Sequence, residues 1–154
     1  MSTPEERVAD LGLELPPVVR PLASYVPTAR TGSLVYTAGQ LPIRAGELLA
    51  TGKVGAEISP EQAAELAKVC ALNVIAALKA EVGELSRVAR IVKVVGFVAS
   101  APDFYGQPKV INGASDLLAA VFGDAGAHAR SAVGVAVLPN NAPVEVEAIA
   151  EVTG

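Results

Sequence analysis

The sequence predicts an α+β domain in which two helices pack on one face of a mixed sheet. Apolar residues recur at three- and four-residue spacing in two segments, and strand-like runs precede, separate and follow these segments. The strands come in runs rather than in strict alternation with helices, which favours a mixed sheet over a parallel one. A chain of 154 residues is long enough for one domain with its own core.

Residues 1–20 are predicted to form a short helix and a proline-rich arm. A hydroxyl residue at the second or third position can cap a helix that starts at Pro4, and Gly12 ends it. Three prolines within residues 15–21 then push their predecessors toward extended geometry. The remaining residues, 21–154, are predicted to form a single domain.

The first predicted strand, residues 33–38, is rich in β-branched and aromatic residues and follows a Thr-Gly turn. Gly39 and Gln40 interrupt this strand. A glycine at a strand end lets a ligand or another backbone approach closely, although a simple bulge is the alternative explanation. Residues 43–49, with Ala-Gly at their centre, are predicted to form a short hairpin.

The first long helix has the clearest start and end signals in the chain. Ser59 is a suitable N-cap, Pro60 stands at the first helical position, and Gln62 completes a capping box. Apolar residues follow at helical spacing as far as Val82, and Gly83 ends the helix. An amphipathic helix of this length is predicted to cover a sheet.

The next strand, residues 91–99, is almost entirely apolar, so we expect it to be central in the sheet. A second helix is predicted from about residue 105 or 108 to residue 122. On the helical period alone, Asn112 and Ser115 lie on its solvated side. The loop that follows contains His128, which we expect to be exposed to solvent rather than catalytic.

The C-terminal region is predicted to be a hairpin. Residues 131–138 are small, apolar and uncharged, as in a buried strand, and a loop with two prolines and two asparagines follows. Residues 144–152 then alternate, which puts Glu145 and Glu147 on one face. Arg130 stands at the root of this hairpin.

Arg130 and the two glutamates allow two interpretations. A guanidinium offers a rigid fork of donors for a carboxylate or phosphate. A carboxylate beside an apolar strand can have its pKa raised enough to exchange protons near neutral pH. The alternative is a structural ion pair between Arg130 and Glu145 or Glu147, because buried charges are normally paired. Residue types alone favour the ion pair.

Composition argues against several classes of site. The chain is 51% hydrophobic and 18% charged, so we expect an oligomer that hides apolar surface. A net charge of −4 without any basic run argues against nucleic-acid binding. Cys70, the single cysteine, lies in a helical apolar context typical of a core, and one histidine with one cysteine leaves no zinc cluster. No P-loop or G-x-G-x-x-G turn indicates a nucleotide cofactor.

The N-terminal stretch is acidic and polar, and it has no apolar core like that of a secretory signal. No other stretch of the sequence approaches the length of a membrane span. We therefore expect a cytoplasmic protein without a membrane partner.

Several segments together carry a resemblance to a known family. The most specific are LVYTAGQLP at 34–42, EVEAIA at 145–150 and the pair Arg130-Ser131; the others are residues 25–26, residues 93–104, Asn112 and Leu138-Pro139. The chain from residue 21 onward resembles the Rid family (reactive intermediate deaminase, also called YjgF or L-PSP endoribonuclease-like). The resemblance implies a chorismate-mutase-like fold and a homotrimer with three clefts, each lined by two neighbouring subunits.

The resemblance also implies an activity, the hydrolysis of enamines and imines derived from amino acids to 2-keto acids and ammonia. Arg130 would hold the substrate carboxylate with help from the backbone N–H of Gly39, and Glu145 would deprotonate the attacking water. Tyr25, Asn112 and Ser131 match the remaining substrate-binding positions: the first two would orient the substrate or close the cleft. No metal or cofactor is implied, since a protonated imine is already a good electrophile.

Departures from the family pattern indicate a divergent branch with an N-terminal extension. Ala38 stands where deaminating members often have serine, and Ala132 where they often have cysteine. Such changes leave a second hypothesis open, a non-catalytic trimer that binds small carboxylic acids. A ribonuclease, which the older family name suggests, is the weakest hypothesis because the chain is acidic and poor in aromatic residues.

Overall fold

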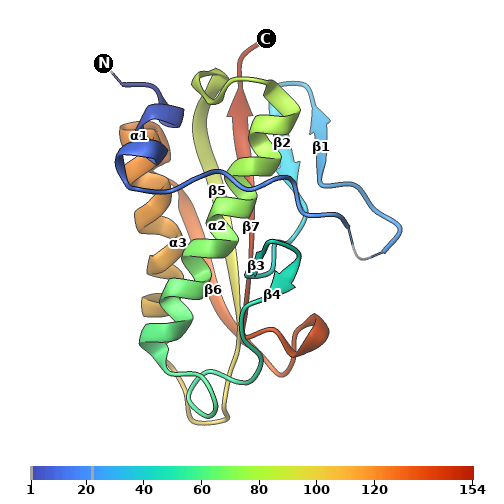
Figure 1. The fold of residues 1–154 in the computed structure, drawn as a ribbon, viewed down its shortest axis with the longest axis vertical. Coiled ribbons are helices and arrows are strands. Elements are labelled where there is room, and N and C mark those ends of the chain that lie inside the picture. The colour runs from blue at the N-terminus through green and yellow to red at the C-terminus, as the bar shows by residue number, and fades with distance from the viewer. Residues whose placement is uncertain (1, 22) are drawn as a thin grey trace.

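The structure is a computed structural model that describes residues 2–21 and 23–154 (Figure 1). Two long helices cover one face of a five-stranded mixed sheet, as the sequence predicted, and the strand order is β1-β2-β7-β5-β6. Neighbouring strands are antiparallel except for the parallel pair β5 and β6. The elements in chain order are α1 (Pro4–Asp10), β1 (Thr28–Thr31), β2 (Leu34–Thr37), β3 (Ile43–Arg44), β4 (Glu47–Leu48), α2 (Pro60–Val82), β5 (Val88–Ala99), α3 (Gln107–Phe122), β6 (Ala129–Val135) and β7 (Val144–Val152).

Helix α2 begins and ends where the sequence predicted. The Ser59 hydroxyl accepts a hydrogen bond from the backbone N–H of Gln62 at 3.1 Å, and Pro60 occupies the first turn. At the other end Gly83 has a φ of 86°, a conformation that suits a residue without Cβ. The apolar side of α2, which includes Cys70, is buried against the sheet and α3. Cys70 is therefore a core residue.

Strand β7 alternates between the two faces of the sheet as predicted. Its helix-facing side chains are buried, whereas Glu145, Glu147 and Ile149 are half-buried on the opposite face. Within residues 2–21 and 23–154 no helix covers that opposite face, which we call the open face. Tyr36 and Val133 each keep 42% of their surface exposed. The open face is thus an apolar surface without cover in the single chain.

The predicted C-terminal hairpin is wrong. Strands β6 and β7 do not pair with each other, because β5 lies between them and pairs with both. β6 is an edge strand with only partial burial, not the buried strand that its apolar residues suggested. The alternation of side chains defines which face a residue lies on, but not which strand lies beside it. A long apolar strand such as β5 can pair along both of its edges.

Two short hairpins complete the strand structure. The predicted hairpin at residues 43–49 is formed by β3 and β4, with φ of 53° at Ala45 and 81° at Gly46. Strand β1 was not predicted, because its sequence is polar and lacks an apolar pattern. It lies at the edge of the sheet and pairs with β2 across the predicted turn at Gly32.

Helix α1 and the arm that follows it lie over the helical layer (Figure 1). The predicted cap is formed, since Thr3 and Glu6 exchange two hydrogen bonds in a capping box. Glu5 forms a salt bridge of 2.7 Å with Lys79 and accepts the backbone N–H of Leu85 at 2.9 Å. Burial acts to raise the pKa of Glu5, but the bonds from Lys79 and Leu85 outweigh it and leave the pKa below the ordinary value.

Candidate active site

Gly39 and Glu145 lie together, and we call this pair the glutamate corner. An irregularity between β2 and β7 builds it. The strands pair at Tyr36 with Ile149 and again at Gln40 with Val146, so three residues on one side oppose two on the other. The bulge is held by a side chain, because the hydroxyl of Thr37 accepts the backbone N–H of Ala148 at 3.0 Å.

The absence of a side chain at Gly39 makes room for the carboxylate of Glu145. A Cβ at this position would overlap Oε2 of Glu145. Of the two explanations for Gly39 that the sequence left open, the structure supports both: the residue belongs to a bulge, and the bulge permits a close approach.

The carboxyl group of Glu145 is half-buried, and its pKa is raised above the ordinary value. Burial is the larger cause, because it penalises the charged form, and repulsion from Glu147 adds to it. Glu147 lies two residues further along the same face of β7. A carboxyl group whose pKa is raised in this way holds a proton more readily than an ordinary glutamate, which suits it to general acid and base catalysis.

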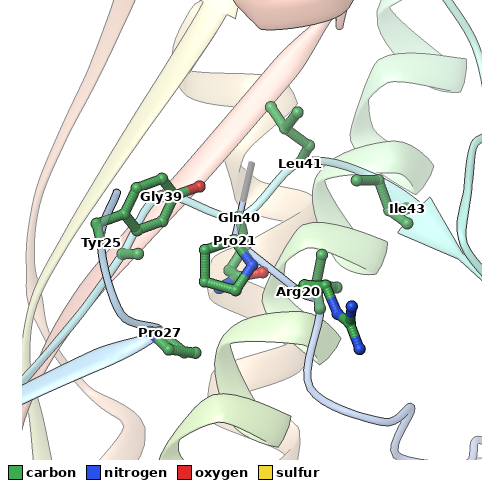
Figure 2. Close-up of a pocket in the computed structure, with 10 residues that line it drawn as sticks. Arg20, Pro21, Tyr25, Pro27, Gly39, Gln40, Leu41 and Ile43 are labelled. Carbon is green, nitrogen blue, oxygen red and sulfur yellow. The ribbon is translucent and has the colours of Figure 1, made fainter. Parts of the chain in front are cut away.

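A shallow pocket lies next to the glutamate corner, between the end of β2 and the N-terminal arm (Figure 2). Tyr25 and Gly39 line one side of it, and the Tyr25 ring points toward Gly39. Arg20 lines the other side, and its guanidinium extends away from Tyr25. Tyr25 is therefore near Gly39, as the sequence hypothesis required, while Arg20 is a pocket residue that sequence reasoning missed.

The chain beyond Gly39 is fixed by a buried asparagine that sequence reasoning also missed. Asn73 of α2 is 1% exposed, and its amide donates to the carbonyls of Leu41 (3.1 Å) and Ile43 (2.9 Å). A polar residue on the buried side of an amphipathic helix is the signal that could have identified it.

A second group of polar residues surrounds Arg130, and we call Asn112, Ser115, His128 and Arg130 the arginine cluster. Nη1 of Arg130 donates to Oδ1 of Asn112 at 2.8 Å and to Oγ of Ser115 at 3.2 Å, and Nη2 donates to the carbonyl of Pro108 at 3.2 Å. All three acceptors belong to α3. The guanidinium is thereby held against the first half of that helix.

Three of the five N–H donors of Arg130 are used in these bonds. The other two N–H groups have no acceptor among the described residues. One of the free donors is on Nε and the other on Nη2. In a guanidinium, Nε–H and the Nη2–H on the same edge can together bind the two oxygens of one carboxylate. Arg130 is thus fixed and still able to bind one carboxylate with a pair of hydrogen bonds.

His128 belongs to this cluster, and the expectation that it would be exposed is wrong. The residue lies in a loop, as predicted, but it is half-buried. Its Nδ1 is 2.6 Å from the carbonyl oxygen of Gly126, and its Nε2 is 2.9 Å from Oγ of Ser115. Ser115 is half-buried too, so the helical period alone placed it wrongly on a solvated side. Its spacing of three residues from Asn112 was the available signal.

The ion pair between Arg130 and Glu145 or Glu147 is not formed. Within the described chain the salt bridge is formed by Glu5 and Lys79, and Arg130 takes no part in one. Arg130 stands opposite Val94 of β5, and Ala148 of β7 lies on the far side of Val94. Arg130 and Glu145 are therefore two strands and three residues apart, about 14 Å between Cα atoms.

The two groups also lie on opposite faces of the sheet. Arg130 reaches α3 and so lies on the helix-covered face, whereas Glu145 lies on the open face. Ser131, which follows Arg130, stands opposite Val95 and is directed to the open face by the alternation of the strand. The predicted site residues thus fall into two groups, Arg130 with Asn112 and Glu145 with Gly39 and Tyr25, and a single chain does not bring these groups together.

Within residues 2–21 and 23–154, no three histidine, cysteine or acidic side chains are grouped closely enough to hold a metal ion. Over the same residues no helix is both long and apolar enough to cross a bilayer.

Comparisons with known proteins agree with the fold. The model of the family described as "YjgF/chorismate mutase-like, putative endoribonuclease" matches residues 5–152. The protein TCP17 of Trypanosoma cruzi is 44% identical over 142 residues, which are 92% of this chain and 89% of that protein.

Two solved structures show how the likeness varies. The protein Atu1372 of Agrobacterium tumefaciens, described as having unknown function, is 46% identical and superposes with a TM-score of 0.92. The match covers 99% of this chain and 94% of the Atu1372 chain. TdcF of Escherichia coli, solved with bound serine, is 27% identical with a TM-score of 0.62 over 90% of this chain and 93% of its own.

Proposed function

Because the chain belongs to the YjgF/chorismate mutase-like family, we propose that it hydrolyses reactive enamines and imines derived from amino acids to 2-keto acids and ammonia. The substrate is a small molecule with one carboxylate. Arg130 binds that carboxylate, and Glu145 moves the protons. The proposal goes beyond the family description, and it rests on the chemistry of the two groups.

The observation that supports the proposal best is the bonding state of Arg130. Its guanidinium is held by Asn112, Ser115 and the Pro108 carbonyl, and within the described residues one N–H donor on Nε and one on Nη2 remain for a ligand. Among the described residues no carboxylate pairs with Arg130, so its charge is available to a carboxylate ligand. TdcF was solved with serine, a small molecule that carries one carboxylate, which suits the same class of ligand.

Glu145 supplies an acid and a base in turn. In its neutral form it donates a proton to the β-carbon of the enamine, and the C=C electron pair forms the new C–H bond while the nitrogen becomes an iminium. The resulting carboxylate takes a proton from water as the water oxygen bonds to the iminium carbon, and the C=N pair moves to nitrogen. The raised pKa of Glu145 favours the neutral form that the first step needs, compared with an ordinary glutamate.

Loss of ammonia completes the reaction. Glu145 returns its proton to the amino group of the carbinolamine, and the C–N bond breaks as the hydroxyl oxygen forms the carbonyl. The hydroxyl proton goes back to the carboxylate, so the enzyme ends in its starting state. The sum is one enamine and one water converted to one 2-keto acid and one ammonia.

A neighbouring subunit is needed to bring the two groups to one substrate. Arg130 and Glu145 lie on opposite faces of the sheet in one chain, about 14 Å apart at their Cα atoms. The open face carries exposed apolar residues such as Tyr36 and Val133, as a surface covered by another chain would. We propose a homotrimer in which Arg130 of one subunit and Glu145 of the next line a shared cleft.

A coupled assay tests the proposal. An amino-acid oxidase generates imines, semicarbazide competes for them, and purified wild type, Arg130→Ala or Glu145→Gln is added. Wild-type protein should suppress semicarbazone formation, and both variants should lose this effect. Lys109→Ala, a change at an exposed position on α3 outside both groups, serves as the control.

A wild type without effect on imines from several amino acids would contradict hydrolysis. Saturable binding of a 2-keto acid that Arg130→Ala abolishes would then support the carboxylic-acid binder. A ribonuclease is not proposed, because the charge of −4 is unfavourable for RNA and the single histidine is bonded to Ser115 and Gly126.

A further inference from the structure

The bond between Ser115 and His128 has no part in the reaction described so far. Ser115 lies between two partners, Nη1 of Arg130 at 3.2 Å and Nε2 of His128 at 2.9 Å. We propose that Ser115 and His128 are positioning residues: neutral His128 accepts the Ser115 proton, so that the Ser115 oxygen accepts from Arg130 and holds the guanidinium for the substrate carboxylate. This inference rests on the proposed function of Arg130.

The hydrogen-bond partners fix which ring nitrogen carries the proton. The Gly126 carbonyl can only accept, so Nδ1 of His128, 2.6 Å away, must be the donor. In a neutral imidazole Nε2 is then an acceptor, and the hydroxyl of Ser115 is the group in reach to donate to it. With a neutral ring, as proposed, the Ser115 proton is therefore directed at Nε2.

The direction of that proton matters to Arg130. A hydroxyl that donates to His128 presents its lone pairs to the guanidinium, which is a donor only. If the imidazole carried two protons, His128 and Arg130 would both donate to the same oxygen, and two cations would share one acceptor. Asp116 and Asp124 are the acidic residues nearest Ser115 and His128 in sequence, and Lys93 of β5 pairs with Ala129, the residue after His128. The structure shows none of them hydrogen-bonded to the ring.

Ser115 differs in burial and in type from the other two acceptors that hold Arg130. Asn112 is exposed and Pro108 offers only a backbone carbonyl, so Ser115 is the one half-buried side-chain acceptor among the three that hold Arg130. Loss of the Ser115 bond would leave Nη1 held by the exposed Asn112 side chain alone. The guanidinium would then spend less time with Nε and Nη2 directed at the substrate.

Four variants separate positioning from folding. His128→Leu removes the acceptor, whereas His128→Gln can place a neutral amide oxygen where Nε2 was. Ser115→Ala removes the hydroxyl, whereas Ser115→Thr keeps it. We expect the Leu and Ala variants to weaken binding of a 2-keto acid and to raise KM about tenfold with a smaller change in kcat. The Gln and Thr variants should stay within about threefold of wild type.

The double variant Ser115→Ala/His128→Leu is expected to be no weaker than either single variant, because both act through one bond. A merely structural role would lower thermal stability in all four variants without rescue by Gln or Thr. That pattern would overturn the inference, as would additive losses in the double variant.

Nitrogen NMR tests the inference without any substrate. The chain has one histidine, so its ring signals can be assigned without ambiguity. Near pH 7.5 we expect a protonated Nδ1 and an unprotonated Nε2, and slow rotation of the Arg130 guanidinium that His128→Leu accelerates. A protonated Nε2, or guanidinium signals unchanged in His128→Leu, would contradict it. If Arg130→Ala retains full hydrolysis, the proposed function fails, while these spectra still decide whether Ser115 and His128 position Arg130.

Discussion

The glutamate corner and the arginine cluster prepare their charged groups in opposite ways. Glu145 is given space by Gly39 and is destabilised in its charged form by burial and by Glu147. Arg130 is held by three hydrogen bonds to α3 and keeps its charge in contact with neutral acceptors. The first group is suited to change its protonation state, and the second is suited to remain fixed.

Because of this difference, we expect substitutions in the two groups to impair different steps of the reaction. A change at the glutamate corner should affect proton transfer and hence kcat, because it alters the position or pKa of one carboxyl group. A change in the arginine cluster should affect the binding of the carboxylate and hence KM.

Gly39→Ala should lower kcat about 100-fold, because the new Cβ displaces the Glu145 carboxylate from its place. The obstructed group is the end of a flexible side chain, so stability should change little. Steady-state kinetics and thermal unfolding measure the two effects.

Gly113→Ala is the matched control. Its Cβ would meet the backbone carbonyl of Ala64, where α2 and α3 pack closely, so we expect a marked loss of thermal stability. Equal melting temperatures for Gly39→Ala and Gly113→Ala would contradict a local effect of Gly39 on Glu145.

Arg130→Lys should raise KM about 30-fold, equivalent to about 2 kcal/mol, while kcat changes less. A lysine keeps the charge but cannot hold the acceptors of α3 and offer a parallel pair of donors as well. Initial rates over a range of substrate concentration separate the two constants. A change confined to kcat would contradict the role of Arg130 as carboxylate anchor.

Glu145→Gln should stabilise the fold at neutral pH although it removes activity. Burial and Glu147 raise the pKa of Glu145 in the folded state, so this group favours folding below the unfolded pKa and loses that contribution as pH rises through the folded pKa. Above the folded pKa, the charged Glu145 lowers the free energy of unfolding, and a neutral glutamine removes this loss.

Thermal unfolding at pH 7 and near pH 4 measures this effect. The variant should melt higher than wild type at pH 7, and the difference should shrink toward pH 4. An equal or lower melting temperature at pH 7 would show that the carboxylate does not bear the expected cost.

Glu5→Gln should have the smallest effect, about 1 kcal/mol of unfolding free energy at pH 7. Hydrogen bonds from Lys79 and Leu85 lower the pKa of Glu5 despite its burial, so its contribution is present above the unfolded pKa and is lost as pH falls through the folded pKa. Denaturant unfolding at pH 7 and pH 3 should show a difference at the higher pH only. Activity should not change.

Much of the fold could be predicted because its signals are local. Caps and terminating glycines fixed both ends of α2, and the alternation of β7 placed Glu145 and Glu147 on one face. The pairing of β6 could not be predicted in this way, since a side-chain period of two is silent on which strand is the neighbour. The polar edge strand β1 lacked any apolar pattern.

The sequence could propose the residues of the candidate site one by one, but it could not predict their arrangement. Motif positions identified Arg130, Glu145 and Gly39, yet their separation on two faces follows from β5 lying between β6 and β7. Ser115 and His128 were assigned to solvent because each was read on its own element. Their bond joins a helix to a loop, and periodicity along one element carries no information about such a bond.

The most direct test of the shared cleft is subunit complementation between Arg130→Ala and Glu145→Gln. Each variant alone should be inactive in the imine assay. When the two are unfolded together and refolded as mixed trimers, about one cleft in four combines an intact Arg130 with an intact Glu145 from the neighbouring subunit. The account predicts recovery to about a quarter of wild-type activity. A mixture that stays as inactive as the separate variants, although mixed trimers are demonstrated by mass, would contradict a site built from two subunits.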